Sequence, residues 1–452
     1  MLLYAGVLVY VSHSSHIFYC TVIVCNGDVM IVVFDKADSL LSISEKYGVP
    51  LDKIYSDNGL GGNKLPVVGQ SIVVLKAKEF LVVQNDTTVN KISEKTGKDV
   101  NTIFRNNYFL SGRQNVPPLS YVVLEYENMP TLRKITGGYA YDFISTSKLL
   151  ETVNYLNYIM PFTYGFTKNG NLVEAQDEFI INIAKQHGVS PLMHVSTLTE
   201  EGVFDSNLPR AVFENNDSLD TLLYSIVDTV DKKGYDGVDV DFEFLPFEQR
   251  ENYVDFLAQL SERLHEKDKI LIVALPPKTS DNQKGALYEG IDYGEIGKYA
   301  DYVLLMTYEY GYRFGPPLAI APIPSVRRVI EYAKTRIPSR KLLLGVPNYG
   351  YDWTLPYVRG MSDAPSISPL EAVDIARRKN VDIKYDEYSK APYFYYTDDD
   401  GKEHEVWFED ARSYEEKVKL VEEYDMAGAF IWEIMRDNPQ GYVTLNSLIK
   451  IM

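Results

Sequence analysis

The stretch that decides the fold runs Asp236-Gly237-Val238-Asp239-Val240-Asp241-Phe242-Glu243. Three carboxyl residues, Asp239, Asp241 and Glu243, alternate with three apolar ones, and a period of two is typical of a β-strand. On a strand the three acids point to one face, each about 7 Å from the next. The apolar set then forms the opposite, buried face, so this strand carries its chemistry on one side and its packing on the other.

This row of acids predicts unusual protonation. Three carboxylates held close together in a partly dry cavity repel one another, so at least one pKa must rise and a proton must be shared along the row. The competing interpretation is an exposed strand edge or a cation site, which the buried apolar alternation disfavours. The six His residues show no metal-ligand spacing. We therefore expect neither a metal nor a cofactor.

Seven further apolar runs of strand length lie in residues 131–452, separated by stretches with helical periodicity. With the quoted strand the eight runs cover residues 134–141, 156–162, 190–195, 237–242, 270–275, 302–306, 341–346 and 428–432. Alternating strands and helices favour the α/β class, and eight repeats predict a (β/α)8 TIM barrel with its chemistry at the carboxyl ends of the strands. A doubly wound sheet is the alternative. Aromatic runs at 392–396 and 406–408 predict a small α+β insertion with antiparallel strands.

An internal repeat organises the N-terminal quarter. Ile43-Ser44-Glu45-Lys46-Tyr47-Gly48 recurs 49 residues later as Ile92-Ser93-Glu94-Lys95-Thr96-Gly97. A fixed period with matched landmarks predicts two duplicated modules, at 30–76 and 78–126, each with the order strand, helix, helix, strand. Asp38-Ser39 and Asp86-Thr87 are expected to cap the first helix of each copy. Gly48 and Gly97 are expected to end these helices in the left-handed conformation.

Residues 1–29 form an extension of uncertain nature. They are mostly apolar, but the run breaks at residues 12–16 and contains no Lys or Arg. A secretory signal needs a positive first region, and a membrane span needs about 20 continuous apolar residues. Three interpretations stay open, namely a poor signal or anchor, a genuine extra strand, or an added segment with the natural start at Met30. We favour Met30, because the first module begins directly after it, and we find no convincing signal peptide.

The composition limits the partners. Lys and Arg number 45 against 63 Asp and Glu, a net charge of −18, and the chain has no strongly basic run. A nucleic acid or an anionic membrane would need a local basic patch, so neither is expected as a partner. The acidic balance favours a neutral or non-polyanionic ligand.

The quoted strand resembles the DxxDxDxE signature of glycoside hydrolase family 18, and further residues support this resemblance. Met306-Thr307-Tyr308 is similar to the motif of the sixth strand in that family, and Trp432 is similar to its sugar-site tryptophan. The resemblance implies that Glu243 is the general acid, that Asp241 orients the substrate acetamide, that Asp239 shares a proton with Asp241, and that Tyr308 hydrogen-bonds the acetamide oxygen. It also implies substrate-assisted, retaining cleavage. The remaining substrate-binding residues are then expected to be Trp432, Met306, Glu309, Tyr164, Asn348 and Tyr349.

The two N-terminal copies resemble the LysM module. Members of that family bind N-acetyl sugars of peptidoglycan or chitin, although a pair of purely structural modules is the alternative. The resemblance assigns sugar binding to Asp38, Ser39 and Gly61 in the first copy and to Asp86, Thr87 and Tyr108 in the second.

Two departures from chitinases indicate which branch of the family the chain resembles. Met193-His194-Val195-Ser196-Thr197 replaces the S-x-G-G of the third strand, and Glu309 follows Tyr308 where chitinases have Asp or Asn. With two LysM modules, these features resemble bacterial spore-cortex-lytic N-acetylglucosaminidases. The resemblance implies a monomeric peptidoglycan hydrolase of the spore coat, cortex or cell wall that cleaves after N-acetylglucosamine and binds N-acetylglucosamine oligomers. The alternatives are a chitinase or chito-oligosaccharide hydrolase, and an inactive sugar-binding lectin.

Overall fold

The computed structural model describes residues 31–61 and 64–452. The three interpretations of residues 1–29 lie outside this part of the chain. Within it, no helix combines the length and the apolar character needed to cross a bilayer.

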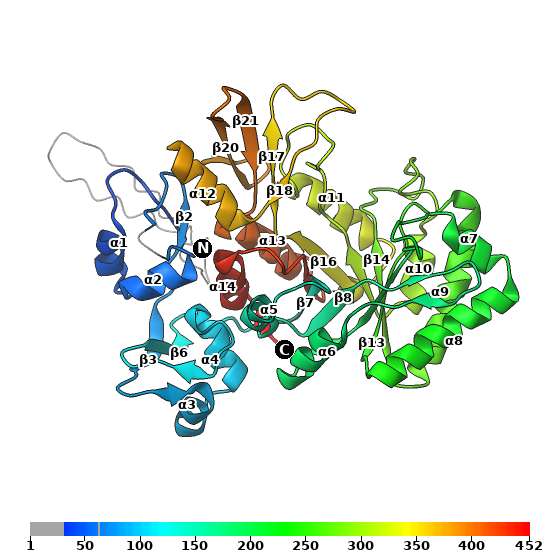
Figure 1. Cartoon of the computed structure of the whole chain (residues 1–452), viewed down its shortest axis with the longest axis horizontal. Helices are drawn as coiled ribbons and strands as arrows, with labels where there is room; N and C mark the ends of the chain where they lie inside the picture. Colours follow the sequence, from blue (N-terminus) through cyan, green and yellow to red (C-terminus); the bar gives the residue numbers. More distant parts are fainter. Residues whose placement is uncertain (1–30, 62–63) are drawn as a thin grey trace, which may run out of the picture.

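A barrel of parallel strands occupies the C-terminal part (Figure 1), as the eight apolar runs predict. Its strands are β7 (Arg133–Tyr141), β8 (Tyr158–Phe162), β11 (Ser190–Pro191) with β12 (Met193–Ser196), β13 (Gly237–Asp241), β14 (Ile270–Leu275), β15 (Tyr302–Leu305), β16 (Leu342–Pro347) and β22 (Gly428–Trp432). Leu192 separates β11, which pairs with β8, from β12, which pairs with β13. The two segments are therefore halves of one third strand, and that strand closes the ring.

Helices cover the outside of the barrel. They are α5 (Thr146–Val153), α6 (Glu178–Gln186), α7 (Leu208–Phe213), α8 (Asn216–Lys233), α9 (Arg250–His265), α10 (Tyr293–Tyr299), α11 (Ile323–Ala333), α13 (Ala411–Glu423) and α14 (Pro439–Leu448). The apolar residues that alternate with the acids of β13 pack in the large core between strands and helices. A second, smaller core fills the barrel interior, as strand alternation requires. The prediction of a TIM barrel is confirmed.

The predicted insertion between β16 and β22 is an antiparallel sheet with one helix, and it lies at the top of Figure 1. Its strands are β17 (Gly350–Thr354), β18 (Ser366–Ile367), β19 (Lys384–Asp386), β20 (Ala391–Thr397) and β21 (Glu403–Trp407), with α12 (Pro369–Lys379) packed on them. The aromatic runs of the sequence are β20 and β21, whose side chains alternate between the small core and the surface.

The two N-terminal modules share one element order. The first has β1 (Ile31–Val33), α1 (Leu40–Tyr47), α2 (Leu51–Asp57) and β2 (Ser71–Val73); the second has β3 (Ala77–Val82), α3 (Val89–Thr96), α4 (Val100–Asn106) and β6 (Tyr121–Tyr126), with β4 (Thr87–Thr88) and β5 (Asn115–Val116) added. Gly48 and Gly97 are left-handed caps, as predicted. Ser39 caps α1 as predicted, but Thr88 caps α3 in place of Asp86 or Thr87, because Thr87 and Thr88 first pair as a short strand with β5.

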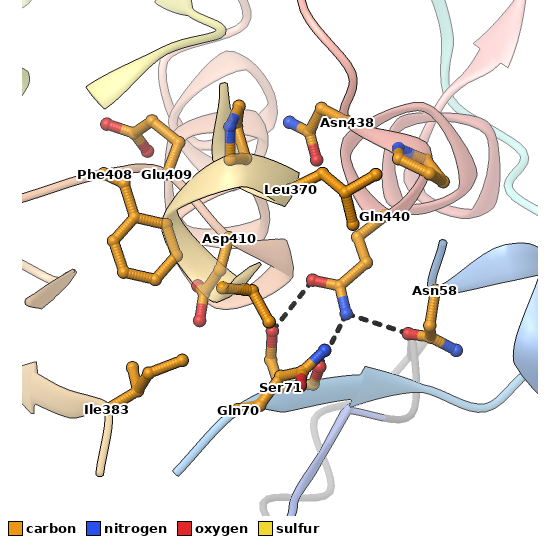
Figure 2. A pocket seen from close by; sticks show the side chains of 13 residues that line it. Asn58, Gln70, Ser71, Leu370, Ile383, Phe408, Glu409, Asp410, Asn438 and Gln440 are labelled. Atoms are coloured by element: carbon orange, nitrogen blue, oxygen red, sulfur yellow. Dashed lines mark hydrogen bonds between the residues drawn. The ribbon is translucent and has the colours of Figure 1, made fainter. Parts of the chain in front are cut away.

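Both modules are docked on the barrel through α14. An apolar cluster joins Val73 and Val123 of the modules to Val443 of α14. Figure 2 shows the polar part of the contact with the first module, where Gln440 Nε2 donates to Asn58 Oδ1 at 2.9 Å and Ser71 Oγ donates to Gln440 Oε1 at 3.0 Å. The cavity left at this contact is only about 20 Å³.

The second module meets the same helix and its neighbour α5. Asn446 Nδ2 of α14 donates to Asn106 Oδ1 at 3.1 Å, and both side chains are buried. Gly112, at φ +67°, lies so close to α5 that a Cβ there would be 2.2 Å from the carbonyl oxygen of Leu150. The modules are therefore packed against the barrel and are not held only by a linker.

Candidate active site

A cavity of about 580 Å³ opens at the carboxyl ends of the barrel strands, the end of a TIM barrel that carries chemistry. Aromatic and carboxyl side chains dominate its wall. The lining residues are Tyr139, Tyr141, Phe162, Ser196, Thr197, Phe204, Ser206, Asp241, Glu243, Phe244, Ala274, Met306, Tyr308, Glu309 and Trp432.

The acid row, Asp239, Asp241 and Glu243, lies at this cavity. Asp241 and Glu243 line it, whereas Asp239 is fully buried one step deeper in β13. Tyr139 of β7 donates a hydrogen bond of 2.7 Å to Asp239 Oδ2. The other oxygen of Asp239 and Oδ1 of Asp241 are buried without a hydrogen-bond partner among the described residues. The row is thus short of donors, as a site that must take up and release protons requires.

The protonation predicted for the row is borne out in direction. Burial, together with the neighbouring carboxyl groups of Asp241 and Glu309, raises the pKa of Glu243 to about 8. Burial also raises the pKa of Asp239 to about 6, against the opposing effects of His194 and of the hydrogen bond from Tyr139. A carboxyl group with a pKa near 8 keeps its proton at neutral pH, which a general acid requires.

Glu309 is held at the cavity by two tyrosines. Its backbone is left-handed, with φ +62°. Its carboxylate accepts hydrogen bonds from Tyr349 and, at 3.0 Å, from Tyr351. Burial raises the pKa of Glu309. Tyr349 itself does not line the cavity, so its predicted contact with substrate is replaced by a contact that positions Glu309.

Trp432 belongs to an aromatic cluster at the end of β22. Its ring centroid lies 5.2 Å from that of Tyr139 and 5.1 Å from that of Phe162, both edge-on. The edge-on contacts hold the indole in a fixed orientation beside Met306 and Tyr308, which line the same cavity.

Two predicted substrate-binding residues lie elsewhere. Tyr164 is buried outside the barrel wall, where its hydroxyl donates to Asp177. Asn348 is buried too, and its amide donates at 2.9 Å to the carbonyl oxygen of Glu433 while it accepts from Tyr414 and Asn438. Neither lines the cavity, because each side chain is already saturated by the protein, and their predicted contact with substrate is corrected accordingly.

The residues predicted to bind sugar in the modules differ in their exposure. Gly61 and Asp86 are exposed, and Ser39 is exposed while its hydroxyl caps α1. Asp38 and Thr87 are half-buried. Tyr108 does not face open solvent: it packs beside Tyr155 and its hydroxyl donates to Glu151 of α5. The second module therefore uses Tyr108 to dock on the barrel.

Sequence reasoning missed part of the cavity wall, namely Tyr141, Phe162, Ser196, Thr197, Phe204, Ser206, Phe244 and Ala274. It also missed two residues beside the acid row. Tyr139 bonds Asp239, and His194 of β12 pairs in register with Asp239 across the sheet. Both occupy inward positions of predicted barrel strands, so strand parity was the signal that could have found them. In the part of the chain that the structure describes, no three His, Cys, Asp or Glu side chains are grouped as a metal site would need.

Comparison with known proteins gives the site a family. Residues 140–437 match the family described as glycosyl hydrolases family 18, and residues 35–74 match the LysM domain. The chain belongs to glycosyl hydrolase family 18. It is a glycoside hydrolase on a TIM barrel with an N-terminal LysM domain, as the acid row and the repeat indicate.

Several known proteins are similar to this family 18 chain over two thirds of its length or more. The cortical fragment-lytic enzyme of Bacillus subtilis (strain 168) is 38% identical over 302 residues, which are 67% of this chain and 70% of that protein. The Bacillus anthracis enzyme of the same name is 33% identical over 420 residues, 92% of this chain and 97% of that one. The crystal structure of the Bacillus cereus spore cortex-lytic enzyme SleL has a TM-score of 0.80 at 33% identity, covering 94% of this chain and 98% of that chain.

Proposed function

We propose that this protein hydrolyses the β-1,4 glycosidic bonds that follow N-acetylglucosamine in spore-cortex peptidoglycan. The observation that carries the proposal is a buried acid row at the carboxyl end of a family 18 barrel, where burial and the neighbouring carboxyl groups raise the pKa of Glu243 to about 8. Relatives that share nearly the whole chain are named for cortical fragments and spore cortex. Their names support the spore cortex or cell wall as the place of action. The proposed acting species is a monomer.

Glu243 is the general acid in this proposal. It lines the cavity beside Asp241, and its proton is available at the pH at which a free carboxyl group would have lost it. Protonating the glycosidic oxygen lets the leaving sugar depart as an alcohol, and this step contributes about 10²–10⁴-fold to the rate.

The nucleophile is the 2-acetamido oxygen of the substrate. Asp241 accepts the acetamide N–H, which stabilises the charge that develops as the ring closes, while Asp239, bonded to Tyr139, shares a proton with Asp241. Tyr308 lies across the same cavity and donates to the acetamide oxygen. Attack from within the substrate followed by attack of water gives retention of configuration.

The surrounding residues bind the sugar. The indole of Trp432 forms the floor beneath the sugar ring, and Met306 and Glu309 complete the wall. The LysM domain and the second module of the same fold bind the glycan strand around Ser39 and Asp86. Because both are docked on α14, they present a bound strand to the barrel in a fixed orientation.

The test is analysis of digestion products. Spore cortex and soluble cortex fragments are incubated with the protein, and the new reducing ends are identified by mass spectrometry. New N-acetylglucosamine ends with retained configuration support the proposal. Muramic acid ends, or no release, would overturn it.

Two other functions have less support. Chitinases among the solved structures share the fold at only 16–24% identity, for example that of Chromobacterium violaceum at 23% with a TM-score of 0.64. Faster hydrolysis of chito-oligosaccharides than of cortex fragments would favour a chitinase. A sugar-binding lectin would lack the acid, whereas Glu243 is present at the cavity.

A further inference from the structure

His194 is a fully buried residue behind the acid row that no role in the proposed reaction yet uses. Its ring lies edge-on to Tyr139, with ring centroids 5.5 Å apart, and against Phe162 at 4.7 Å. Its Nε2 atom lies 3.9 Å from Asp239 Oδ2 and 3.8 Å from Asp241 Oδ2. This nitrogen has no hydrogen-bond partner within residues 31–61 and 64–452.

The other ring nitrogen decides which way the proton points. Nδ1 lies 2.6 Å from the hydroxyl of Thr163. With two carboxyl oxygens within 4 Å of Nε2, a lone pair there would face further lone pairs, so the tautomer with the proton on Nε2 is favoured. Nδ1 then accepts from Thr163, and the Nε2 proton is aimed between Asp239 and Asp241.

We propose that His194 is a positioning residue that holds Asp241 in place to accept the acetamide N–H of the substrate, through an Nε2–H donor shared by Asp239 and Asp241. The distances of 3.8 and 3.9 Å exceed a hydrogen bond, so in this state the donor acts through its field. Rotation of either carboxyl group toward the ring completes the bond. The inference rests on the proposed function, since it assigns Asp241 a substrate contact.

The groups that face the ring are few. Asp239 and Asp241 come from β13 and Tyr139 from β7, and Thr163 approaches from the segment after β8. No Lys or Arg of the described residues forms an ion pair with either acid, so His194 is the only basic side chain paired with them. The electrostatic effect of His194 lowers the pKa of Asp239, which agrees with this assignment.

Two substitutions distinguish the role of the Nε2–H donor from the role of the ring volume. In His194→Gln the side-chain amide reaches the position of Nε2 and can still donate. In His194→Phe the ring volume stays and the donor is lost. For Phe we expect a fall in kcat of about 10- to 100-fold with little change in KM, and an acid limb of the pH–rate profile displaced upward by about one pH unit. For Gln we expect most of the activity and an acid limb in its original place.

The experiment measures kcat and KM on soluble cortex fragments across the pH range, with thermal unfolding of each variant as a check on folding. If His194 only fills space, the order of activities reverses, with His194→Phe near wild type and His194→Gln impaired, and that result would overturn the proposal. Equal pH–rate profiles for wild type and both variants would overturn it as well. Thr163→Val tests the same point without changing the histidine. Without the hydroxyl that donates to Nδ1, either ring nitrogen can carry the proton. The acid limb should therefore move in the same direction as in His194→Phe. A wild-type protein that releases no N-acetylglucosamine ends would refute the proposed function instead.

Discussion

Two of the places where carboxyl groups are buried in the described part of the chain differ sharply in their surroundings. One is the acid row, Asp239, Asp241 and Glu243, inside the barrel. The other, the Asp177 cluster, lies outside the barrel wall, where Asp177 accepts from Tyr164 and Tyr235 and pairs with Lys233 Nζ at 2.8 Å. Both Asp177 and Asp239 are completely buried.

The difference between them is the supply of donors. Asp177 has a cation and two hydroxyl groups, so its negative charge is compensated where it is formed. The acid row has one tyrosine hydroxyl and a distant imidazole for three carboxyl groups, and two of its oxygens have no partner among the described residues. A buried carboxylate whose charge is balanced by donors and a cation stabilises the fold. Carboxyl groups with too few donors have raised pKa values, so they hold protons that can be passed to a substrate.

The largest effect is expected from Glu243→Gln. The amide cannot donate a proton to the glycosidic oxygen, so kcat on cortex fragments should fall by about 10²–10⁴-fold while sugar binding is retained. Turnover and ligand binding are measured separately. Activity within about tenfold of wild type would remove Glu243 as the acid.

Asp177→Asn should affect folding instead of turnover. Losing the carboxylate leaves Lys233 with less compensation in a partly buried position, and we expect the free energy of unfolding to fall by about 2–3 kcal/mol. Denaturant unfolding measures this change. Asp220→Asn, whose side chain is 70% exposed in its ion pair with Arg263, is the matched control with an expected change below about 0.5 kcal/mol. Loss of turnover by a stably folded Asp177→Asn protein would contradict the division between the clusters.

The pH dependence of stability should reveal the raised pKa of Glu243 in the acid row. The pKa of Glu243 rises on folding from its ordinary value of 4.5 to about 8, so between these values the folded state binds the proton more strongly than the unfolded chain. Stability therefore falls as pH rises through this window, by up to about 1.4 kcal/mol per pH unit from this group. Glu243→Gln removes the penalty, so its unfolding temperature should match wild type near pH 4 and exceed it near pH 8. A constant difference across this range would count against a raised pKa.

The smallest effects come from single hydroxyl groups. Tyr235→Phe removes one donor to Asp177 and should lower the free energy of unfolding by about 1 kcal/mol with an unchanged pH–rate profile. Tyr139→Phe removes the donor to Asp239, whose pKa should rise further, so the acid limb should move to higher pH. Kinetics across the pH range compare the two variants. Identical profiles would mean that the donor count does not set the protonation of the row.

The barrel and its acid row could be predicted because both depend on local periodicity. Buried parallel strands are apolar runs, and a period of two fixes which side chains face inward. The position of Tyr164 could not be predicted in this way, because its partner Asp177 is set by tertiary packing and leaves no mark in the sequence around the tyrosine. His194 stood in the predicted third strand, yet its importance depends on its distance to Asp239, which only the register of β12 against β13 determines.

The modules show the same limit. Their internal repeat predicted two copies of one fold, and both copies are present. Nothing in the repeat predicted that Tyr108 would bond Glu151 or that Gln440 would reach Asn58, because these partners lie on separate elements of the barrel. Docking surfaces between domains are therefore visible only in the folded structure.

Because the modules pack on α14, near the C-terminus, their docking must wait until most of the chain has been synthesised. Gln440 and Asn58 are separated by 382 residues, and Asn446 and Asn106 by 340. Synthesis proceeds from the N-terminus and domains fold as they emerge, so both modules leave the ribosome with the apolar patch around Val73 and Val123 uncovered. The patch stays exposed until the barrel is nearly complete. Between the emergence of the modules and the translation of α14, the exposed patch makes the nascent chain prone to aggregation.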